Sequence, residues 1–340
     1  MLYKFFKWIV RLTLHSYFRK IVITGYHNIP SNGPVIFVAN HPSAFMDPMV
    51  VGSTIDSSIH FLAAAEFFGK GIKSWFYQKQ LNMIPVFRPT TLPGETYKNE
   101  EVFSKCFELL GRGGSILVFP EGNSVTEKRI RKLKTGVARM ALGTTEFTKG
   151  AVHVVVVPIG LNYTNPHRFQ SEVFVKIGQP ISTHQFTSDN SQVVKLTEEI
   201  EAGLKQTVLH IQTEELDSVV KKIEVIMKPE FQGGISHRKK NEFLFHQKVI
   251  QSIEEISKKE PLQISALETK LDLYLNKIRS LGISDGSLAR LSTFVSLVEL
   301  VRLMLAFPLF LFGYLINSIP YQSTVWYFRS LKIFSHEGFE

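Results

Sequence analysis

Short apolar runs alternate with amphipathic stretches between residues 21 and 180. The stretches at residues 69–80, 94–111 and 133–147 have the apolar spacing of helices. Several of the apolar runs are apolar at every position, which is typical of parallel sheets covered by helices on both faces. The sequence therefore predicts an α/β fold with a mixed, largely parallel sheet flanked by helices. The strand-like runs are IVIT, VIFVA, IHFLAA, NMIPVF, SILVFP, VHVVVVPIG and EVFVKIG.

The pattern changes after the last of these runs. Residues 186–290 are charged and helical in spacing, without a strand-like run or a candidate catalytic cluster, so they predict an added helical region. Inside them, residues 228–240 (KPEFQGGISHRKK) have the Pro and Gly pair of a linker.

The N-terminal segment, residues 1–20, predicts an amphipathic helix. It sets Phe5, Trp8 and Leu12, with Phe6 and Ile9, against scattered basic residues, and its apolar stretch is too interrupted for a signal peptide. This composition suits a helix that lies in a membrane interface. The alternative is an amphipathic helix that packs on the domain.

The C-terminal segment, residues 291–340, is strongly apolar. No charged residue occurs from Leu303 to Phe328, and within this stretch LMLAFPLFLFGYLINSI, residues 303–319, is near the length that spans or dips into a bilayer. Because Pro308 and Gly313 lie within it, a kinked or re-entrant helix is favoured over a straight span, and a buried core helix is the alternative. The predicted division is thus residues 1–20, 21–185, 186–290 and 291–340, with membrane-associated segments at both ends.

The net charge of +9 indicates an anionic partner. Nucleic acid, phosphorylated metabolites and anionic lipid headgroups all fit that sign, but 27 Phe and only 3 Trp favour lipid or an apolar core over base stacking. The aromatic pattern of a single-strand binder is absent, so a nucleic-acid partner is not expected. Cys106 is the only cysteine; we expect it in the core and the chain in a reducing compartment.

A candidate site begins where the second apolar run turns polar, in the sequence NHPSAFMD. His41 and Asp47 stand there within one short turn. An imidazole supported by a carboxylate can take a proton from a substrate hydroxyl, so no nucleophile of the protein's own is needed. The alternative is that Asn40, Pro42 and Asp47 are ordinary turn residues.

Further polar residues follow other strand-like runs. Arg88 ends NMIPVFR, and its planar guanidinium group can bind two phosphate oxygens. The alternative interpretation is that Arg88 is a solvated loop residue. Glu121 and Gly122 follow the run ILVF; the carboxylate can bind acceptor hydroxyls and the glycine permits close backbone approach. The basic residues at 128–134 predict a mostly solvated loop. Since the carboxyl ends of parallel strands meet at one edge, we expect these residues to share a site.

Taken in order, NHPSAFMD, NMIPVFR, FPEGNS and VVPIG resemble the four blocks of the glycerolipid acyltransferase family, over residues 21 to about 180. The resemblance implies that His41 is the general base, that Asp47 supports it, and that Arg88, Glu121 and Gly122 bind the acceptor. LKTGVARMAL resembles the segment after the third block, which implies that Lys134 lies near the acceptor phosphate. No metal site is implied, because the histidines are not spaced as ligands.

Two departures from the family pattern refine this resemblance. Five residues separate His41 from Asp47 instead of four, which resembles the branch with fungal glycerol-3-phosphate and dihydroxyacetone-phosphate acyltransferases. Asn123 and Ser124 stand where an arginine is usual, so phosphate binding is assigned to Arg88 and Lys134.

The resemblance implies an O-acyltransferase of phospholipid biosynthesis on the cytoplasmic face of a membrane. It would move a fatty acyl group from acyl-CoA or acyl carrier protein, as co-substrate and without a cofactor, to glycerol 3-phosphate or a related glycerol phosphate. Lysophosphatidate is the alternative acceptor. A non-catalytic, membrane-docked lipid-binding protein is the alternative from another class.

Overall fold

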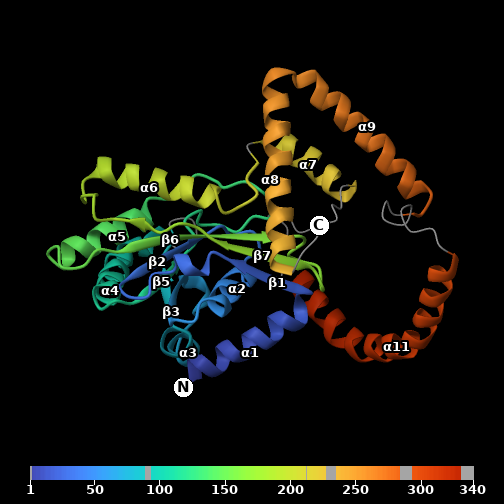
Figure 1. Cartoon of the computed structure of the whole chain (residues 1–340). Coiled ribbons are helices and arrows are strands. Elements are labelled where there is room, and N and C mark those ends of the chain that lie inside the picture. Colours follow the sequence, from blue (N-terminus) through green and yellow to red (C-terminus); the bar gives the residue numbers. More distant parts are fainter. Residues whose placement is uncertain (1, 89–92, 212, 227–234, 284–292, 331–340) are drawn as a thin grey trace. The chain divides into compact units, whose positions relative to one another are not determined.

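The computed structural model describes residues 2–88, 93–211, 213–226, 235–283 and 293–330 (Figure 1). The chain divides into two units, Met1–Asp272 and Leu273–Glu340. Each unit is described by itself.

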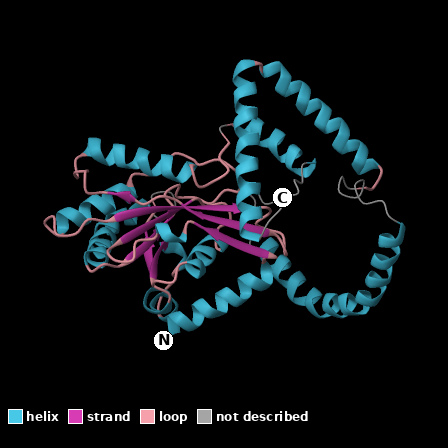
Figure 2. Cartoon of the chain, viewed as in Figure 1, coloured by secondary structure: helices cyan, strands magenta, loops and turns pink. Residues whose placement is uncertain are grey.

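One sheet organises the first unit (Figure 2). Its strands follow the order β1-β7-β6-β2-β5-β3-β4, with β8 paired to β6. Among these pairs β6 is antiparallel to β7 and to β8, and the others are parallel, so the prediction of a mixed, largely parallel sheet is confirmed. The strands are β1 (Lys20–Thr24), β2 (Val35–Ala39), β3 (Ile59–Ala64), β4 (Met83–Val86), β5 (Ser115–Val118), β6 (Val155–Tyr163), β7 (Glu172–Ile177) and β8 (Ile181–Ser182).

Helices follow most strands. The α-helices of the first unit are α1 (Leu2–Tyr17), α2 (Met46–Thr54), α3 (Ile72–Gln80), α4 (Asn99–Gly111), α5 (Gly136–Phe147), α6 (Asn190–Lys205), α7 (Glu214–Ile226), α8 (Ile235–Lys259) and the greater part of α9 (Pro261–Ser280). Short 3-10 helices occupy Tyr26–Asn28, Ala65–Phe67 and Pro93–Lys98.

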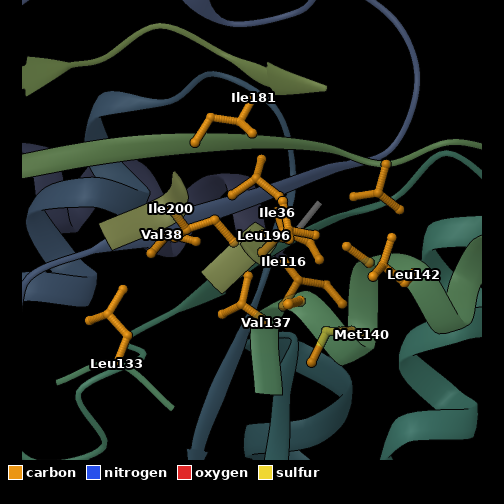
Figure 3. Packing of buried hydrophobic residues seen from close by; sticks show 14 of the residues in the cluster. Ile36, Val38, Ile116, Leu133, Val137, Met140, Leu142, Ile181, Leu196 and Ile200 are labelled. Atoms are coloured by element: carbon orange, nitrogen blue, oxygen red, sulfur yellow. The ribbon is translucent and has the colours of Figure 1, made fainter. Parts of the chain in front are cut away.

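The sheet buries both of its faces, as the all-apolar strands predict. Along β2, Ile36 and Val38 face a core shared with α4, α5 and α6, which includes the buried Cys106 (Figure 3). Alternate residues, among them Phe37, face a second core shared with α1 and α2. This alternation follows from the period of two along a strand. Two helical layers therefore cover the two faces of the sheet. The carboxyl ends of the parallel strands, which polar residues follow, form the edge at which a site can lie.

One local prediction is wrong, and a second is wrong for its last six residues only. Asp47 does not lie in a turn, because residues Met46–Thr54 form α2 and Asp47 stands in its first turn. The linker predicted at residues 228–240 is helical from Ile235 onward, within α8, and residues 227–234 lie outside the described residues. The predicted helical region is otherwise present as α6 to α9. The division into four segments stays a prediction.

Helix α1 packs onto the domain through apolar residues, Leu14 and Val10 among them, and also through its basic side chains. Arg11 donates to the carbonyl of Ser53 (2.7 Å) and pairs with Asp56 (2.6 Å), and Lys7 donates to the carbonyl of Ile55. Phe5 and Trp8 remain 53% and 60% exposed. The two cations therefore cap the C-terminal end of α2, where a helix carries partial negative charge, and an apolar face is left outward.

The second unit contains one long helix, α11 (Thr293–Ser330), drawn bent in Figure 1. Within it, Leu300–Ser323 is long and apolar enough to cross a membrane, and none of this window is buried. Taken by itself, the second unit therefore does not bury this window, and its association with a membrane stays a prediction. Pro308 and Pro320 lie inside α11, and proline removes a helical hydrogen bond, which accounts for the bend.

Candidate active site

His41 and Asp47 meet at the carboxyl end of β2. The side chain of Asn40 extends the pairing of β2 with β6. Its Oδ1 accepts from the backbone N–H of Leu161 (2.7 Å), and its Nδ2 donates to the carbonyl of Leu161 (3.0 Å). His41 Nδ1 lies 2.8 Å from Asp47 Oδ2. The turn before α2 thus brings together an imidazole and a carboxylate that are six residues apart.

The imidazole has a defined orientation. Its ring stacks on Phe119, with the ring centroids 4.1 Å apart and the planes 16° apart, and its side chain is 16% exposed. Because Asp47 accepts from Nδ1–H, Nε2 is the ring nitrogen that can take up a proton from a substrate. The pair therefore has the geometry of an oriented general base.

Asp47 is fully buried and receives three hydrogen bonds. Its Oδ2 accepts from His41 Nδ1 and from the backbone N–H of Ser43 (2.8 Å), and its Oδ1 accepts from the Tyr163 hydroxyl (2.8 Å). Burial raises the pKa of the Asp47 carboxyl, and these three bonds act in the opposite direction. Sequence reasoning missed Tyr163, although it stands just after the fourth block, in VPIGLNY.

Glu121 is buried and contacts the backbone of His41. Its Oε1 accepts from the backbone N–H of His41 (3.3 Å), and its Oε2 pairs with Arg131 Nε (3.0 Å). Burial raises the pKa of the Glu121 carboxyl, while Arg131 lowers it. Glu121 therefore joins the end of β5 to the His41 backbone and to the basic loop.

Most basic residues of the loop at 128–134 are exposed, as predicted: Arg129, Lys132 and Lys134 are exposed, whereas Lys128 and Arg131 are partly buried. Arg131 pairs with Glu121 and also with Glu127 (3.2 Å), Arg129 pairs with Glu127 (3.2 Å), and Lys128 pairs with Glu224. These ion pairs fix the loop against the site and the helical region. Of these acidic partners only Glu224 is distant in the sequence, because Glu121 and Glu127 lie within ten residues of the arginines that they pair with.

Gly122 and Lys134 lie against each other. Gly122 has a φ of +83°, and a Cβ added to it would lie 2.5 Å from Lys134 Nζ. The Lys134 backbone N–H donates to the carbonyl of Pro120 (3.0 Å), while its side chain is exposed. The glycine therefore allows a cationic side chain to cross the strand end.

Arg88 follows β4 and is half-buried, at the same carboxyl edge as His41 and Glu121. Strands β5 and β3 separate β4 from β2. At a strand spacing of about 4.8 Å, the axes of β2 and β4 are roughly 14 Å apart. Arg88 therefore belongs to the edge as predicted, but at the far side of it from the His41–Asp47 pair.

The segment after Gly122, in which Asn123 and Ser124 stand where an arginine is usual in the family, bonds to the backbone of the turn that follows His41. Ala44 has a φ of +39°, an uncommon conformation for a residue other than glycine, and its backbone N–H donates to Ser124 Oγ (2.7 Å). Val125 N–H donates to the His41 carbonyl (3.1 Å), and the Thr126 hydroxyl donates to the Pro42 carbonyl (2.8 Å). The longer spacer is thus held by residues 124–126. In the part of the chain that the structure describes, no group of three His, Cys, Asp or Glu residues could hold a metal ion.

Comparisons with known proteins show that this chain is similar to acyltransferases. The family model described as Acyltransferase matches residues 20–162. Glycerol-3-phosphate O-acyltransferase 1 of Saccharomyces cerevisiae is 26% identical, over 68% of this chain and 42% of the yeast protein. A chloroplastic 1-acyl-sn-glycerol-3-phosphate acyltransferase of Arabidopsis thaliana is 30% identical, over 42% of this chain and 36% of the plant protein. This chain therefore spans less than half the length of either relative.

Among solved structures, the crystal structure of the 1-acyl-sn-glycerophosphate (LPA) acyltransferase PlsC from Thermotoga maritima is similar. It has a TM-score of 0.44 and 24% identity, over 60% of this chain and 78% of that chain.

Proposed function

We propose that the chain is an O-acyltransferase that acylates a glycerol phosphate, and the premise is that the family model described as Acyltransferase matches residues 20–162. The observation that carries the proposal is the oriented His41–Asp47 pair, with Nε2 of His41 directed away from the carboxylate. It stands at the carboxyl edge of a largely parallel sheet, where ligands collect in such folds.

The proposed reaction begins when His41 Nε2 takes the proton of an acceptor hydroxyl. The hydroxyl oxygen bonds to the thioester carbonyl carbon of acyl-CoA or acyl carrier protein, and Asp47 stabilises the imidazolium that forms. The tetrahedral intermediate then collapses, the C–S bond breaks, and the imidazolium returns its proton to the leaving thiolate. No cofactor is required, because the thioester supplies the activated acyl group.

Binding of the acceptor phosphate is proposed for Arg88 and Lys134. Both are cationic and both follow strands at the carboxyl edge. Glu121 and Gly122 act at the floor of the site: the carboxylate supports the His41 backbone, and the glycine admits the Lys134 side chain. An arginine fork and a lysine point charge are common means of binding phosphate.

Glycerol 3-phosphate is the proposed acceptor, and lysophosphatidate is the second candidate. The five-residue spacer between His41 and Asp47 favours the first, as does the similarity to yeast glycerol-3-phosphate O-acyltransferase 1 over 68% of this chain. The similarity to chloroplastic 1-acyl-sn-glycerol-3-phosphate acyltransferase covers 42% of it.

We further propose that the chain is a membrane enzyme whose active site lies on the cytoplasmic face of the bilayer. Within the first unit, exposed apolar side chains lie on α1 and near the His41 turn, where Phe45 contacts Phe67 with ring centroids 5.2 Å apart. In the second unit, Leu300–Ser323 supplies a candidate span. Apolar area removed from water contributes about 25 cal/mol per Å², so both segments can supply membrane affinity.

The test is an acceptor screen with the purified full chain in detergent or vesicles. Radiolabelled acyl-CoA and acyl carrier protein are each offered with glycerol 3-phosphate, dihydroxyacetone phosphate and lysophosphatidate. Acylation of glycerol 3-phosphate at the highest kcat/KM is expected. Acylation of lysophosphatidate alone would overturn the acceptor. Tight lipid binding without any transfer would instead identify a non-catalytic lipid-binding protein.

A second experiment tests the membrane proposal. The full chain is expected to pellet with membranes and to resist high-salt extraction. Removal of residues 291–340 should make the remainder extractable by salt, whereas replacing Trp8 by Gln should weaken its binding to vesicles. A full chain that stays in the soluble fraction without detergent would contradict the proposal.

A further inference from the structure

Tyr163 is the member of the His41–Asp47 site to which neither the sequence motifs nor the proposed reaction assign a role. Its hydroxyl donates to Asp47 Oδ1 at 2.8 Å, on the opposite carboxylate oxygen from His41. Asp47 is completely buried, so each of its oxygens needs a donor from the protein. Resting on the proposed function, we propose that Tyr163 is a positioning residue that holds the Asp47 carboxylate in the orientation that directs His41.

The geometry of the carboxylate supports this role. A carboxylate can rotate about its Cβ–Cγ bond, and that rotation would move Oδ2 away from His41 Nδ1. Ser43 N–H fixes Oδ2 from the turn, and Tyr163 fixes Oδ1 from the sheet. Two donors from independent elements therefore prevent the rotation, and the imidazole keeps the tautomer that leaves Nε2 unprotonated.

The fold delivers the hydroxyl to this position through β6. Asn40 fixes β6 beside the end of β2 by its two bonds to Leu161, and Tyr163 stands two residues further on the same face of the strand. Residue Tyr163 pairs with Val173 of β7, and its ring lies 5.8 Å from that of Phe18. Backbone pairing and ring packing therefore hold the phenol in place independently of its bond to Asp47.

Tyr163 also remains a donor over the working pH range. Burial and the neighbouring Asp47 raise the pKa of the Tyr163 hydroxyl well above its usual value, so it keeps its proton. Among the described residues, the charged groups linked to the pair by a hydrogen bond or an ion pair are Glu121, which accepts from the His41 backbone N–H, and Arg131, which pairs with Glu121. Neither bonds to the Asp47 oxygens.

The test compares Tyr163→Phe with Tyr17→Phe in the full chain. Both substitutions remove one hydroxyl and keep a ring in the same core, and the Tyr17 hydroxyl donates to the Pro166 carbonyl (3.4 Å), not to Asp47. Acyl transfer to the preferred acceptor is measured from pH 5 to pH 9. We expect kcat of Tyr163→Phe to fall about tenfold or more with an unchanged acceptor KM, because a hydrogen bond to a charged group is lost. Tyr17→Phe should behave as the wild type.

The pH profile separates this role from simple packing. Without the phenol, the Asp47 carboxylate is less stabilised and more basic, so the His41–Asp47 pair takes up a proton at higher pH. The acid limb of kcat is therefore expected to move upward by about half a unit to one unit in Tyr163→Phe. Replacement of Tyr163 by 3-fluorotyrosine, a stronger donor that retains the hydroxyl, should move the limb downward. It also provides a test should Tyr163→Phe fail to fold.

Three outcomes would overturn the proposal: an unmoved acid limb in both Tyr163 variants, a wild-type kcat for Tyr163→Phe, or equal losses in Tyr163→Phe and Tyr17→Phe. A wild-type chain that transfers no acyl group would overturn the proposed function instead. In that case NMR of the His41 ring still tests the inference, because the resonance of the Nδ1–H that bonds to Asp47 should move in Tyr163→Phe and stay in place in Tyr17→Phe.

Discussion

The turn after β2 and the turn after β4 lie at the same edge of the sheet, yet they are held in different ways. Asp47 receives bonds from three groups on two separate elements, and His41 is bonded to it and stacked on Phe119. The β4 end is fixed one residue before Arg88, by Asn99 side-chain bonds to the backbone of Phe87 (2.8 and 3.0 Å).

The difference corresponds to two different tasks. A proton transfer slows when the base moves by a fraction of an ångström, so neighbouring groups must hold the base in a fixed position. A phosphate attracts a long cationic side chain over several ångströms, so its ligand needs charge and reach. We therefore expect substitutions at the β2 end to change kcat and substitutions at the β4 end to change the acceptor KM.

The largest expected effect is that of His41→Ala. Loss of the general base should lower kcat by about a thousandfold or more while the chain still binds membranes. Acyl transfer assays on the full chain measure the loss, with His27→Ala, an exposed histidine after β1, as the matched control. Activity of His41→Ala within threefold of the wild type would make the turn structural.

Asp47→Asn should have the next largest effect on activity and a different effect on stability. The amide cannot stabilise an imidazolium as a carboxylate does, so kcat should fall by about a hundredfold. Because the pKa of Asp47 is raised by burial, its ionised form disfavours the folded state, and this cost grows as pH rises through the carboxyl range.

The neutral amide avoids that cost and can satisfy the same partners. The melting temperature of Asp47→Asn at pH 7 should therefore equal or exceed that of the wild type. Thermal unfolding at pH 5 and pH 8 checks the sign, since the difference in favour of the variant should be larger at pH 8. A lower melting temperature at pH 8 would mean that the ionised carboxylate stabilises the fold.

Arg88→Ala is expected to act mainly on binding. Removal of the fork should raise the acceptor KM by about tenfold and leave the acyl-donor KM nearly unchanged. Steady-state kinetics with each substrate varied in turn measure this. The control is Arg112→Ala, an exposed arginine before β5 and hence at the opposite edge of the sheet. A rise confined to the acyl-donor KM would assign Arg88 to the donor phosphates.

The smallest expected effect concerns the backbone of the His41 turn. Ala44 has a φ of +39°, so Ala44→Gly should relieve strain and change the free energy of unfolding by less than about 1 kcal/mol, in the stabilising direction. Ala44→Val, with a branched side chain, should destabilise the chain. Urea unfolding measures the free energy of unfolding of the two variants. If glycine destabilises the chain and valine does not, the backbone at Ala44 is not strained.

Much of this architecture could be predicted from local sequence. Strands such as VIFVA are apolar at every position because both faces of the sheet are covered, and that requirement is visible without a structure. His41, Arg88 and Glu121 follow such runs directly, so their common edge could also be predicted. The α2 helix was missed because the Pro and Ser near its start resemble turn residues and the helix is only nine residues long.

The tertiary structure alone decided which side chains complete the site. Tyr163 reaches Asp47 across 116 residues of sequence, and Arg131 reaches Glu121 only because the basic loop folds back over the end of β5. The outward position of Phe5 and Trp8 on α1 likewise depends on distant partners: Leu14 packs into the second core, and Arg11 bonds to carbonyl and carboxylate groups at the end of α2. Apolar periodicity is a local property that burial imposes on every strand and helix. A hydrogen bond between distant segments depends instead on strand register and on the direction of each side chain, which are set only when the whole sheet has formed.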